Sequence, residues 1–149
     1  MPLLKIFSSA EPLPEPRRSE LLHAASQLLA RELGKPEAYV MTCLVPQTAM
    51  TFAGSDSPSA YAEVKNIGTF SPELTARLSR ELCALLSNAL GVPSNRIYLE
   101  FNEAKAHLWG FDGGWSALGA SSIRMRPWRS QPTVSSQVFA GTMQGGPTL

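Results

Sequence analysis

Apolar residues recur at helical spacing in two stretches of the chain. In both stretches leucine and alanine stand three or four positions apart, which places them on one face of a helix. The first set is Leu21, Leu22, Ala25, Leu28, Leu29 and Leu33, and the second is Leu74, Leu78, Leu82, Leu85, Leu86 and Ala89. The pattern predicts two amphipathic helices, each of which packs one face against a core.

The ends of both predicted helices are marked by residues that start or stop a helix. Gly34 and Gly91 stand where a left-handed C-terminal cap is favoured, and a proline two residues later prevents each helix from continuing. The stretch "SPEL" at residues 71–74 offers an N-cap serine, a proline at the first helical position and an early acid. Pro16 is expected to start the first helix in the same way.

Each predicted helix lies between two short apolar segments, so the chain repeats one unit. The stretch "LARELGKPEAYVMTCL" at residues 28–44 is echoed by "LSNALGVPSNRIYLEF" at 86–101, in which a helix end, a proline, a short connection and a tyrosine precede a strand. Further strands are predicted before the helices, at Leu3–Ser8 and Ala60–Ile67. Because a right-handed crossover makes the two strands of a unit parallel, we predict an α+β fold of two layers. Tandem β-α-β units form a four-stranded mixed sheet with both helices on one face.

The other face of this sheet is predicted to be bare. In the last strand Ile97, Leu99 and Phe101 alternate with Tyr98 and Glu100, so the apolar set packs under the helices while the other side chains point away. A bare sheet face on so small a unit suggests association with copies of itself.

Composition and charge fit a single globular core. The 149 residues are 44% apolar and 17% charged, and the net charge of +1 gives no reason to expect nucleic acid as a partner. Cys43 and Cys83 are predicted to be small buried side chains rather than a disulfide or a metal site. No apolar stretch approaches the roughly 20 residues that span a bilayer, and the N-terminus lacks the pattern of a signal segment. We therefore expect a cytoplasmic protein.

The C-terminal part of the chain differs from the rest. From about Gly113 onward it holds no acidic residue, three arginines and many Ser, Gly, Pro, Thr and Gln residues. Such a composition predicts a flexible, weakly basic extension. We therefore divide the chain into a folded domain at residues 1–116 and an extension at 117–149. In the extension "RMRPWR" is interpreted as a solvated basic cluster, with contact to a partner as the alternative.

Five separated stretches of the chain together carry a family resemblance: "MPLLKIF", "LGKPEAYV", "MTFAGSDSP", "EVKNIG" and "NRIYLEFNEAKAHLWGF". In their order and spacing they resemble the macrophage migration inhibitory factor family of the tautomerase superfamily, and the similarity runs from Pro2 to about Asp112. The resemblance implies a homotrimer with a pocket at each subunit interface. It also implies an isomerase that interconverts the keto and enol forms of phenylpyruvate-like acids or tautomerises dopachrome derivatives, without a metal or an organic cofactor.

The resemblance also implies roles for seven residues, matched motif to motif. Pro2, freed by removal of Met1, is the catalytic base, and Lys35 in "LGKP" is the cation that meets the substrate carboxylate. Ile67 in "KNIG" offers its backbone N–H and side chain to the pocket. The remaining residues are Tyr98, which enters from the neighbouring subunit, Glu100 near the same pocket, and the apolar walls Trp109 and Phe111.

Two features of the sequence depart from the family's pattern. Many animal members have asparagine where this chain has Glu100, which adds a negative charge near the pocket. The cysteine pair that forms a thiol redox motif in some members is absent from "SPSAYAE", so redox activity is not expected.

The predicted chemistry needs a base that is neutral near pH 7. An α-amino group has a reference pKa of about 7.7 to 8.0, closer to neutrality than that of lysine. Burial against Ile67, Trp109 and Phe111 and the charge of Lys35 lower this pKa further, whereas an ionised Glu100 acts in the opposite direction. A base whose pKa lies near the operating pH is the most effective one.

Each assignment has a structural alternative. Proline is tolerated at the start of a strand, a lysine at a helix end interacts favourably with the helix dipole, and the aromatic residues can serve as packing or subunit contacts. The functional alternative is a cytokine-like protein in which catalysis is vestigial and a surface binds a receptor. Family members can be exported without a signal peptide. A further hypothesis is that the basic extension folds over the pocket and controls access to it.

Overall fold

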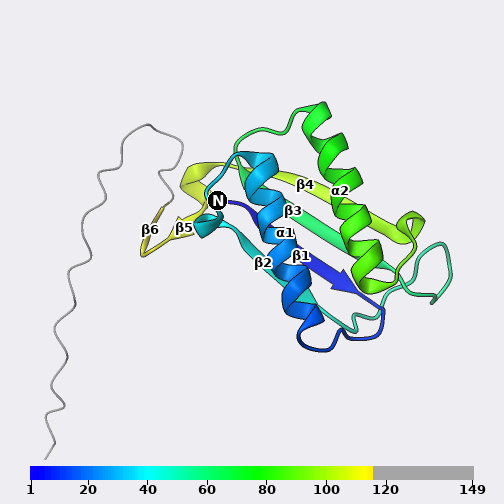
Figure 1. Cartoon of the computed structure of the whole chain (residues 1–149). Coiled ribbons are helices and arrows are strands. Elements are labelled where there is room, and N and C mark those ends of the chain that lie inside the picture. Colours follow the sequence, from blue (N-terminus) through cyan, green and yellow to red (C-terminus); the bar gives the residue numbers. More distant parts are fainter. Residues whose placement is uncertain (116–149) are drawn as a thin grey trace, which may run out of the picture.

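The computed structural model describes residues 1–115. Two β-α-β units follow one another, and a small hairpin comes after them (Figure 1). The elements are β1 (Leu3–Ser8), α1 (Arg17–Leu33), β2 (Met41–Val45), β3 (Ala60–Ile67), α2 (Pro72–Leu90), β4 (Ile97–Ala104), β5 (Gly110–Phe111) and β6 (Gly114–Trp115), with short 3-10 turns at Glu37–Tyr39, Ser94–Arg96 and Ala106–Leu108.

The four long strands form one mixed sheet in the order β2-β1-β3-β4. Within each unit the strands are parallel, and the two units meet through the antiparallel pair β1 and β3. This topology confirms the predicted fold. In the central pair Leu3 stands opposite Lys65, so the start of β1 lies beside the end of β3.

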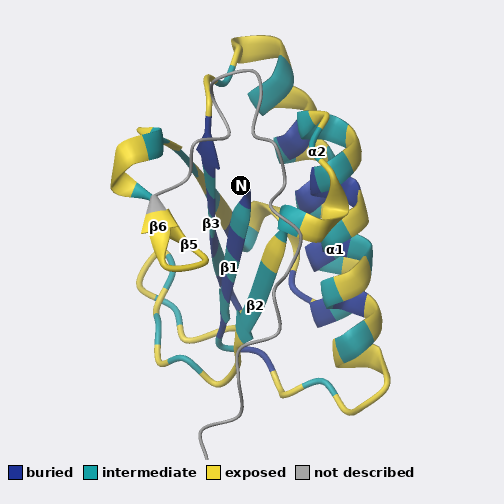
Figure 2. Ribbon diagram, turned by 90° about the vertical axis from the view of Figure 1, so that its left-hand side faces the viewer, coloured by how far each residue is buried: buried dark blue, intermediate teal, exposed yellow. Residues whose placement is uncertain are grey.

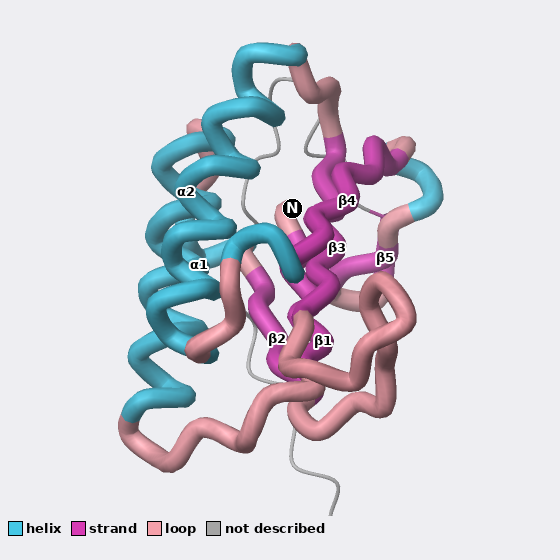
Figure 3. Tube along the Cα trace, turned by 90° about the vertical axis from the view of Figure 1, so that its right-hand side faces the viewer, coloured by secondary structure: helices cyan, strands magenta, loops and turns pink. Residues whose placement is uncertain are grey.

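Both helices cover the same face of the sheet (Figures 2 and 3). Side chains of β1 alternate between partly exposed and buried, and β3 shows the same alternation up to Lys65 because successive residues point to opposite faces. The buried side chains of the strands pack against the apolar faces of the helices, which confirms the predicted core. The fully covered core residues include Leu4, Ile6, Val64, Leu29, Leu78, Leu82 and Leu86.

Helix ends follow the predicted signals with one difference. Gly34 and Gly91 adopt left-handed backbone conformations, with φ of 60° and 67°, and the Ser71 side chain accepts a hydrogen bond from Leu74 N–H at 3.2 Å. Pro16, in contrast, is the N-cap residue of α1 rather than its first helical residue. Its backbone carbonyl still accepts a hydrogen bond from Glu20 N–H at 3.0 Å, so the helix begins one residue later than the pattern suggested.

Three further details differ from the sequence pattern or extend it. The two tyrosines of the repeat are not equivalent, because Tyr39 ends the first 3-10 turn whereas Tyr98 lies inside β4, and Arg96 ends the corresponding turn. Cys43 and Cys83 are free thiols but only half-buried, so the prediction that both are buried side chains was wrong. The β5–β6 hairpin was not predicted.

The predicted extension at 117–149 lies outside the described residues. Within residues 1–115 neither helix is long and apolar enough to cross a membrane. The same part of the chain contains no cluster of three or more His, Cys, Asp or Glu side chains arranged to hold a metal ion.

Candidate functional site

Pro2 is buried at the start of β1. Its ring is almost completely shielded from solvent, and its carbonyl accepts a hydrogen bond from Met41 N–H at 3.0 Å. This bond continues the parallel pairing of β1 with β2 by one residue. The sheet therefore fixes the backbone of Pro2 although its nitrogen cannot donate to the ladder.

The amino terminus beside Pro2 is electrostatically disposed to be neutral. Burial lowers the pKa of the Met1 amine below its ordinary value of 8.0, and the nearby charge of Lys35 lowers it further. In the full chain this amine belongs to Met1. In a chain from which Met1 has been removed, the terminal amine is instead the Pro2 nitrogen, one residue further along the chain. The environment of the Met1 amine therefore indicates the surroundings of that nitrogen.

Lys35 reaches this end of the sheet because of the way α1 ends. The left-handed conformation of Gly34 turns the chain, and Lys35 N–H then donates a hydrogen bond to the Ala30 carbonyl at 3.0 Å. Pro36 follows and prevents the helix from continuing. The half-buried Lys35 is thus held close enough to the amine to influence its pKa.

The end of β3 supplies the neighbouring wall. Ile67 is only 7% exposed, and it lies two residues beyond Lys65, the partner of Leu3 in the antiparallel pair. Ile67 is therefore at the same end of the sheet as Pro2. Its neighbour Asn66 is also buried, and within the described residues Asn66 Oδ1 has no hydrogen-bond partner. Sequence analysis gave Asn66 no role.

An aromatic pair extends the same end of the molecule. Phe111, half exposed in β5, meets the ring of Tyr39 edge-on, with the ring centroids 6.0 Å apart. Tyr39 belongs to the turn between Lys35 and β2, so this contact places Phe111 near the Lys35 end of the sheet. Trp109 is half-buried, and its backbone N–H donates to the Ala106 carbonyl at 3.1 Å. The motif "LGKPEAYV" contains Tyr39, but no role had been predicted for it.

Tyr98 and Glu100 lie elsewhere on the sheet. Tyr98 pairs with Tyr61, which pairs with Phe7, five residues along β1 from Pro2. At about 3.4 Å per residue the separation along the strands is about 17 Å. Tyr98 is 65% exposed on the bare face, as the alternation in β4 predicted. One chain therefore does not bring all the predicted site residues together.

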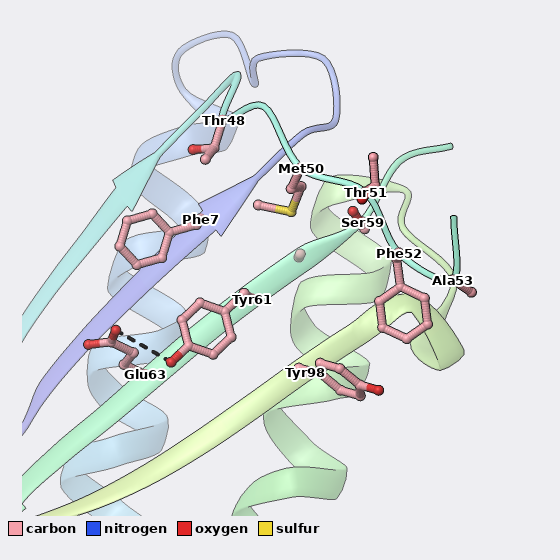
Figure 4. Close-up of a pocket in the computed structure, with 11 residues that line it drawn as sticks. Phe7, Thr48, Met50, Thr51, Phe52, Ala53, Ser59, Tyr61, Glu63 and Tyr98 are labelled. Carbon is pink, nitrogen blue, oxygen red and sulfur yellow. Dashed lines mark hydrogen bonds between the residues drawn. The ribbon is translucent and has the colours of Figure 1, made fainter. Parts of the chain in front are cut away.

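Tyr98 lines a cavity of about 610 Å³ at its own end of the bare face (Figure 4). Its walls are mostly aromatic or apolar and include Phe7, Met50, Phe52, Tyr61 and Tyr98, with Glu63 as an acidic member. The ring centroids of Phe52 and Tyr98 are 4.8 Å apart. Figure 4 also shows the Tyr61 hydroxyl directed to Glu63, an interaction of 3.4 Å.

Glu100 is engaged by its own chain. The Tyr61 hydroxyl donates a hydrogen bond to one carboxylate oxygen, and Asn102 Nδ2 donates to the other at 2.8 Å. The bond from Tyr61 is the main cause that lowers the pKa of Glu100, and that from Asn102 adds to it. The hydrogen bond between Tyr61 and Glu100 is also the main cause that raises the pKa of Tyr61 to about 12. Glu100 is therefore an ionised carboxylate at neutral pH.

The predicted site residues thus form two groups at different places on the sheet, called here the two halves. One half holds a buried proline, an amine with a lowered pKa, a lysine and an apolar wall. The other half holds an exposed tyrosine, an ionised carboxylate and an aromatic cavity. The first half can accept a proton and bind an anion, and the second can enclose an apolar group.

Comparisons with known proteins agree on one family. The model of the macrophage migration inhibitory factor (MIF) family matches residues 1–117. A macrophage migration inhibitory factor homolog of Trichuris trichiura is 31% identical over 74% of this chain and 97% of its own length. The homolog of Brugia malayi is 38% identical over 64% of this chain and 83% of its own length.

Solved structures show the same relationship. The crystal structure of a homologue from Prochlorococcus marinus shares 41% identity and aligns with a TM-score of 0.71, over 76% of this chain and 97% of that one. Leishmania major MIF2 shares 31% identity with a TM-score of 0.70, over 77% of this chain and 97% of its own.

Proposed function

The chain belongs to the macrophage migration inhibitory factor family, and we propose that it is a keto–enol tautomerase with Pro2 as its general base. The substrates are phenylpyruvate-like or dopachrome-like acids. The enzyme is an isomerase and works as a homotrimer after removal of Met1. The observation that supports this proposal most directly is the lowered pKa of the amine at the amino terminus, beside the buried Pro2 and Lys35.

The environment of the amino terminus favours the form of the amine that catalysis needs. Burial and the Lys35 charge both disfavour the ammonium state, so a larger fraction of the base is neutral at pH 7. Removal of Met1 converts the Pro2 nitrogen from an amide into a secondary amine with a lone pair. The hydrogen bond from Met41 N–H to the Pro2 carbonyl and the pairing of β1 with β2 and β3 from Leu3 onward then hold that lone pair at a fixed place.

The reaction moves one proton between carbon and oxygen. The Pro2 nitrogen takes a proton from the carbon next to the ketone, and the electron pair of that C–H bond forms the carbon–carbon double bond. The electrons of the ketone π bond move to its oxygen, which receives the proton that Pro2 holds. Lys35 binds the substrate carboxylate and keeps the acid oriented for both transfers.

The other half of the pocket comes from a second chain. Tyr98 and Glu100 lie on the bare face far from Pro2 of their own chain, so in the trimer they serve the neighbouring pocket. Tyr98 packs on the apolar part of the substrate, together with Ile67, Trp109 and Phe111 of the chain that supplies Pro2. Glu100, ionised and bonded to Tyr61, disfavours a second anionic group at that end.

The test combines mass spectrometry with kinetics. The intact mass of the purified chain shows whether Met1 has been removed, and turnover is measured with phenylpyruvate and with dopachrome methyl ester. We expect Pro2→Gly to lower kcat/KM by about 10² to 10⁴-fold, the usual contribution of a general base. Pro12→Gly, at an exposed proline of the loop after β1, is the matched control and should retain full activity.

Two results contradict the proposal. One is a working protein that retains Met1, because its Pro2 nitrogen is then an amide without basicity. The other is turnover in the wild type no greater than in Pro2→Gly. If turnover is absent and the protein binds a receptor equally well with Pro2→Gly, the cytokine-like role of the family is favoured instead.

A further inference from the structure

Arg96 gathers the loop between β2 and β3 around its guanidinium group. It ends the 3-10 turn before β4, and its nitrogens donate to four backbone carbonyls of residues 52–58. The donor–acceptor distances are 2.9 Å to Pro58, 3.3 Å to Phe52, 3.2 Å to Ser55 and 2.7 Å to Ser57. A planar fork with five N–H donors suits such converging acceptors, whereas a lysine ammonium does not.

The segment that Arg96 holds has an unfavourable local backbone. Ala53 and Gly54 both adopt positive φ angles, 52° and 72°, and Phe52 and Ser55 exchange backbone hydrogen bonds of 3.0 Å across this tight turn. A left-handed alanine is disfavoured by its Cβ. The carbonyls of Phe52 and Ser55 at the two ends of this turn both accept hydrogen bonds from Arg96, so this cation helps to hold the turn in its disfavoured conformation.

The same guanidinium group connects the turn to Tyr98. Arg96 Cζ lies 5.2 Å from the centroid of the Phe52 ring, and Phe52 in turn packs on Tyr98 with centroids 4.8 Å apart. Arg96 directly precedes β4 and Tyr98 is the second residue of that strand, so the contacts link Arg96, the turn, Phe52 and Tyr98 to one another. Figure 4 shows the Phe52 ring next to that of Tyr98, and the two ring planes are tilted by 53°.

We propose that Arg96 is a positioning residue for Tyr98. By fixing the turn it holds Phe52 behind the exposed Tyr98 ring, and the ring keeps the orientation in which it enters the pocket of the neighbouring chain. Arg96 itself touches no substrate. This inference rests on the proposed function, because it assigns Tyr98 to a pocket whose base is Pro2 of another chain.

The kinetic consequence differs from that of a general loss of stability. Tyr98 encloses the apolar part of the substrate and takes no part in proton transfer. Arg96→Met should therefore raise KM and lower kcat/KM by about 10 to 100-fold, as expected for a misplaced binding group. The pH dependence of kcat should stay that of the wild type, because the base and Lys35 are untouched. Arg80→Met, at an exposed arginine of α2, is the matched control and should leave both constants unchanged.

Two further variants separate positioning from folding. Arg96→Lys retains the charge but not the fork, so its KM should lie between those of the wild type and Arg96→Met. Phe52→Leu keeps an apolar side chain but removes the ring between Arg96 and Tyr98, and it should raise KM even if Arg96→Met fails to fold. In the double variant Arg96→Met/Phe52→Leu, the two increases in KM should not multiply, because both substitutions act through the contact between Phe52 and Tyr98.

The outcomes are distinct. An unchanged KM in Phe52→Leu, or fully multiplicative effects in the double variant, would overturn the positioning role while Pro2-dependent turnover leaves the proposed function intact. A fall in kcat with an altered pH profile would also overturn it, since Arg96 would then affect the base. A wild-type chain without Pro2-dependent turnover would refute the proposed function, and the positioning role with it.

Discussion

A mixture of two impaired variants should recover activity if each pocket is built from two chains. Pro2→Gly removes the base from one half of the site, and Tyr98→Ala removes the aromatic ring from the other half. The register of the sheet separates these residues by about 17 Å along the strands and by two strand spacings of about 4.8 Å, or about 20 Å in total. A tyrosine side chain does not bridge this separation, so Tyr98 cannot serve the Pro2 of its own chain.

The size of the recovery follows from counting pockets. In a trimer assembled at random from equal amounts of the two variants, a pocket is intact when its base comes from a Tyr98→Ala chain and its ring from a Pro2→Gly chain. Each condition holds for half of the chains, so about a quarter of the pockets are intact in a closed ring of identical contacts. The mixture should therefore show about a quarter of the wild-type kcat/KM.

The assay refolds the two purified variants together from denaturant and measures kcat/KM with phenylpyruvate at low substrate concentration. Wild-type chains refolded in the same way define full activity, and each variant refolded alone gives its background. Mass measurement under native conditions verifies that mixed trimers are present. Activity equal to the mean of the two backgrounds, in a sample that contains mixed trimers, would show that Pro2 and Tyr98 act within one chain and would refute the two-chain pocket.

Three smaller predictions test the charges and the core. Lys35→Met should move the acid limb of the pH profile of kcat/KM to higher pH, because the amine at the start of the chain loses a positive charge that lowers its pKa. Burial, the larger cause, remains, so the shift is partial, and KM for the carboxylate substrate should rise. Leu82→Ala, at a fully buried position of α2, should lower the free energy of unfolding in urea by about 3 to 5 kcal/mol, while Arg80→Ala on the exposed side should change it by less than about 0.5 kcal/mol. Tyr61→Phe should raise the pKa of Glu100 toward 4.5 in a carboxyl NMR titration, because Glu100 loses its principal hydrogen-bond donor.

The fold could be predicted from the sequence because its signals are local. The strand bounds Leu3–Ser8 and Ala60–Ile67 follow from short apolar runs, and the helix ends follow from caps such as Gly34 and Ser71. Each of these signals acts within a few residues. The start of α1 was displaced by one residue because Pro16 satisfies either position at a helix start, and the pattern alone does not separate the two.

The contacts of the site were less predictable because they depend on register and on distant loops. Tyr61 donates to Glu100 only because β3 and β4 pair in a register that aligns Tyr61 with Tyr98. Arg96 reaches carbonyls that lie 38 to 44 residues away in the chain. The hydrophobic periodicity of the sequence predicts neither of these contacts. Family resemblance supplied the roles of the predicted residues, but it did not indicate which neighbours hold them.

Exposed apolar side chains suggest how the two halves of the site meet. Within the described residues, large apolar side chains are exposed on both edge strands of the sheet and near the hairpin: Met41, Val45, Tyr98, Leu108 and Phe111. A contact between two β4 edges would bury Tyr98 but leave the apolar side chains of β2 and the hairpin in water, and a contact between two β2 edges would do the reverse. A head-to-tail contact instead joins the β4 edge of one chain to the β2 and hairpin side of the next, so it buries both. If such contacts close into a ring with Tyr98 of each chain at the Pro2 end of its neighbour, as proposed above, burial of apolar surface and completion of the pocket follow from the same arrangement.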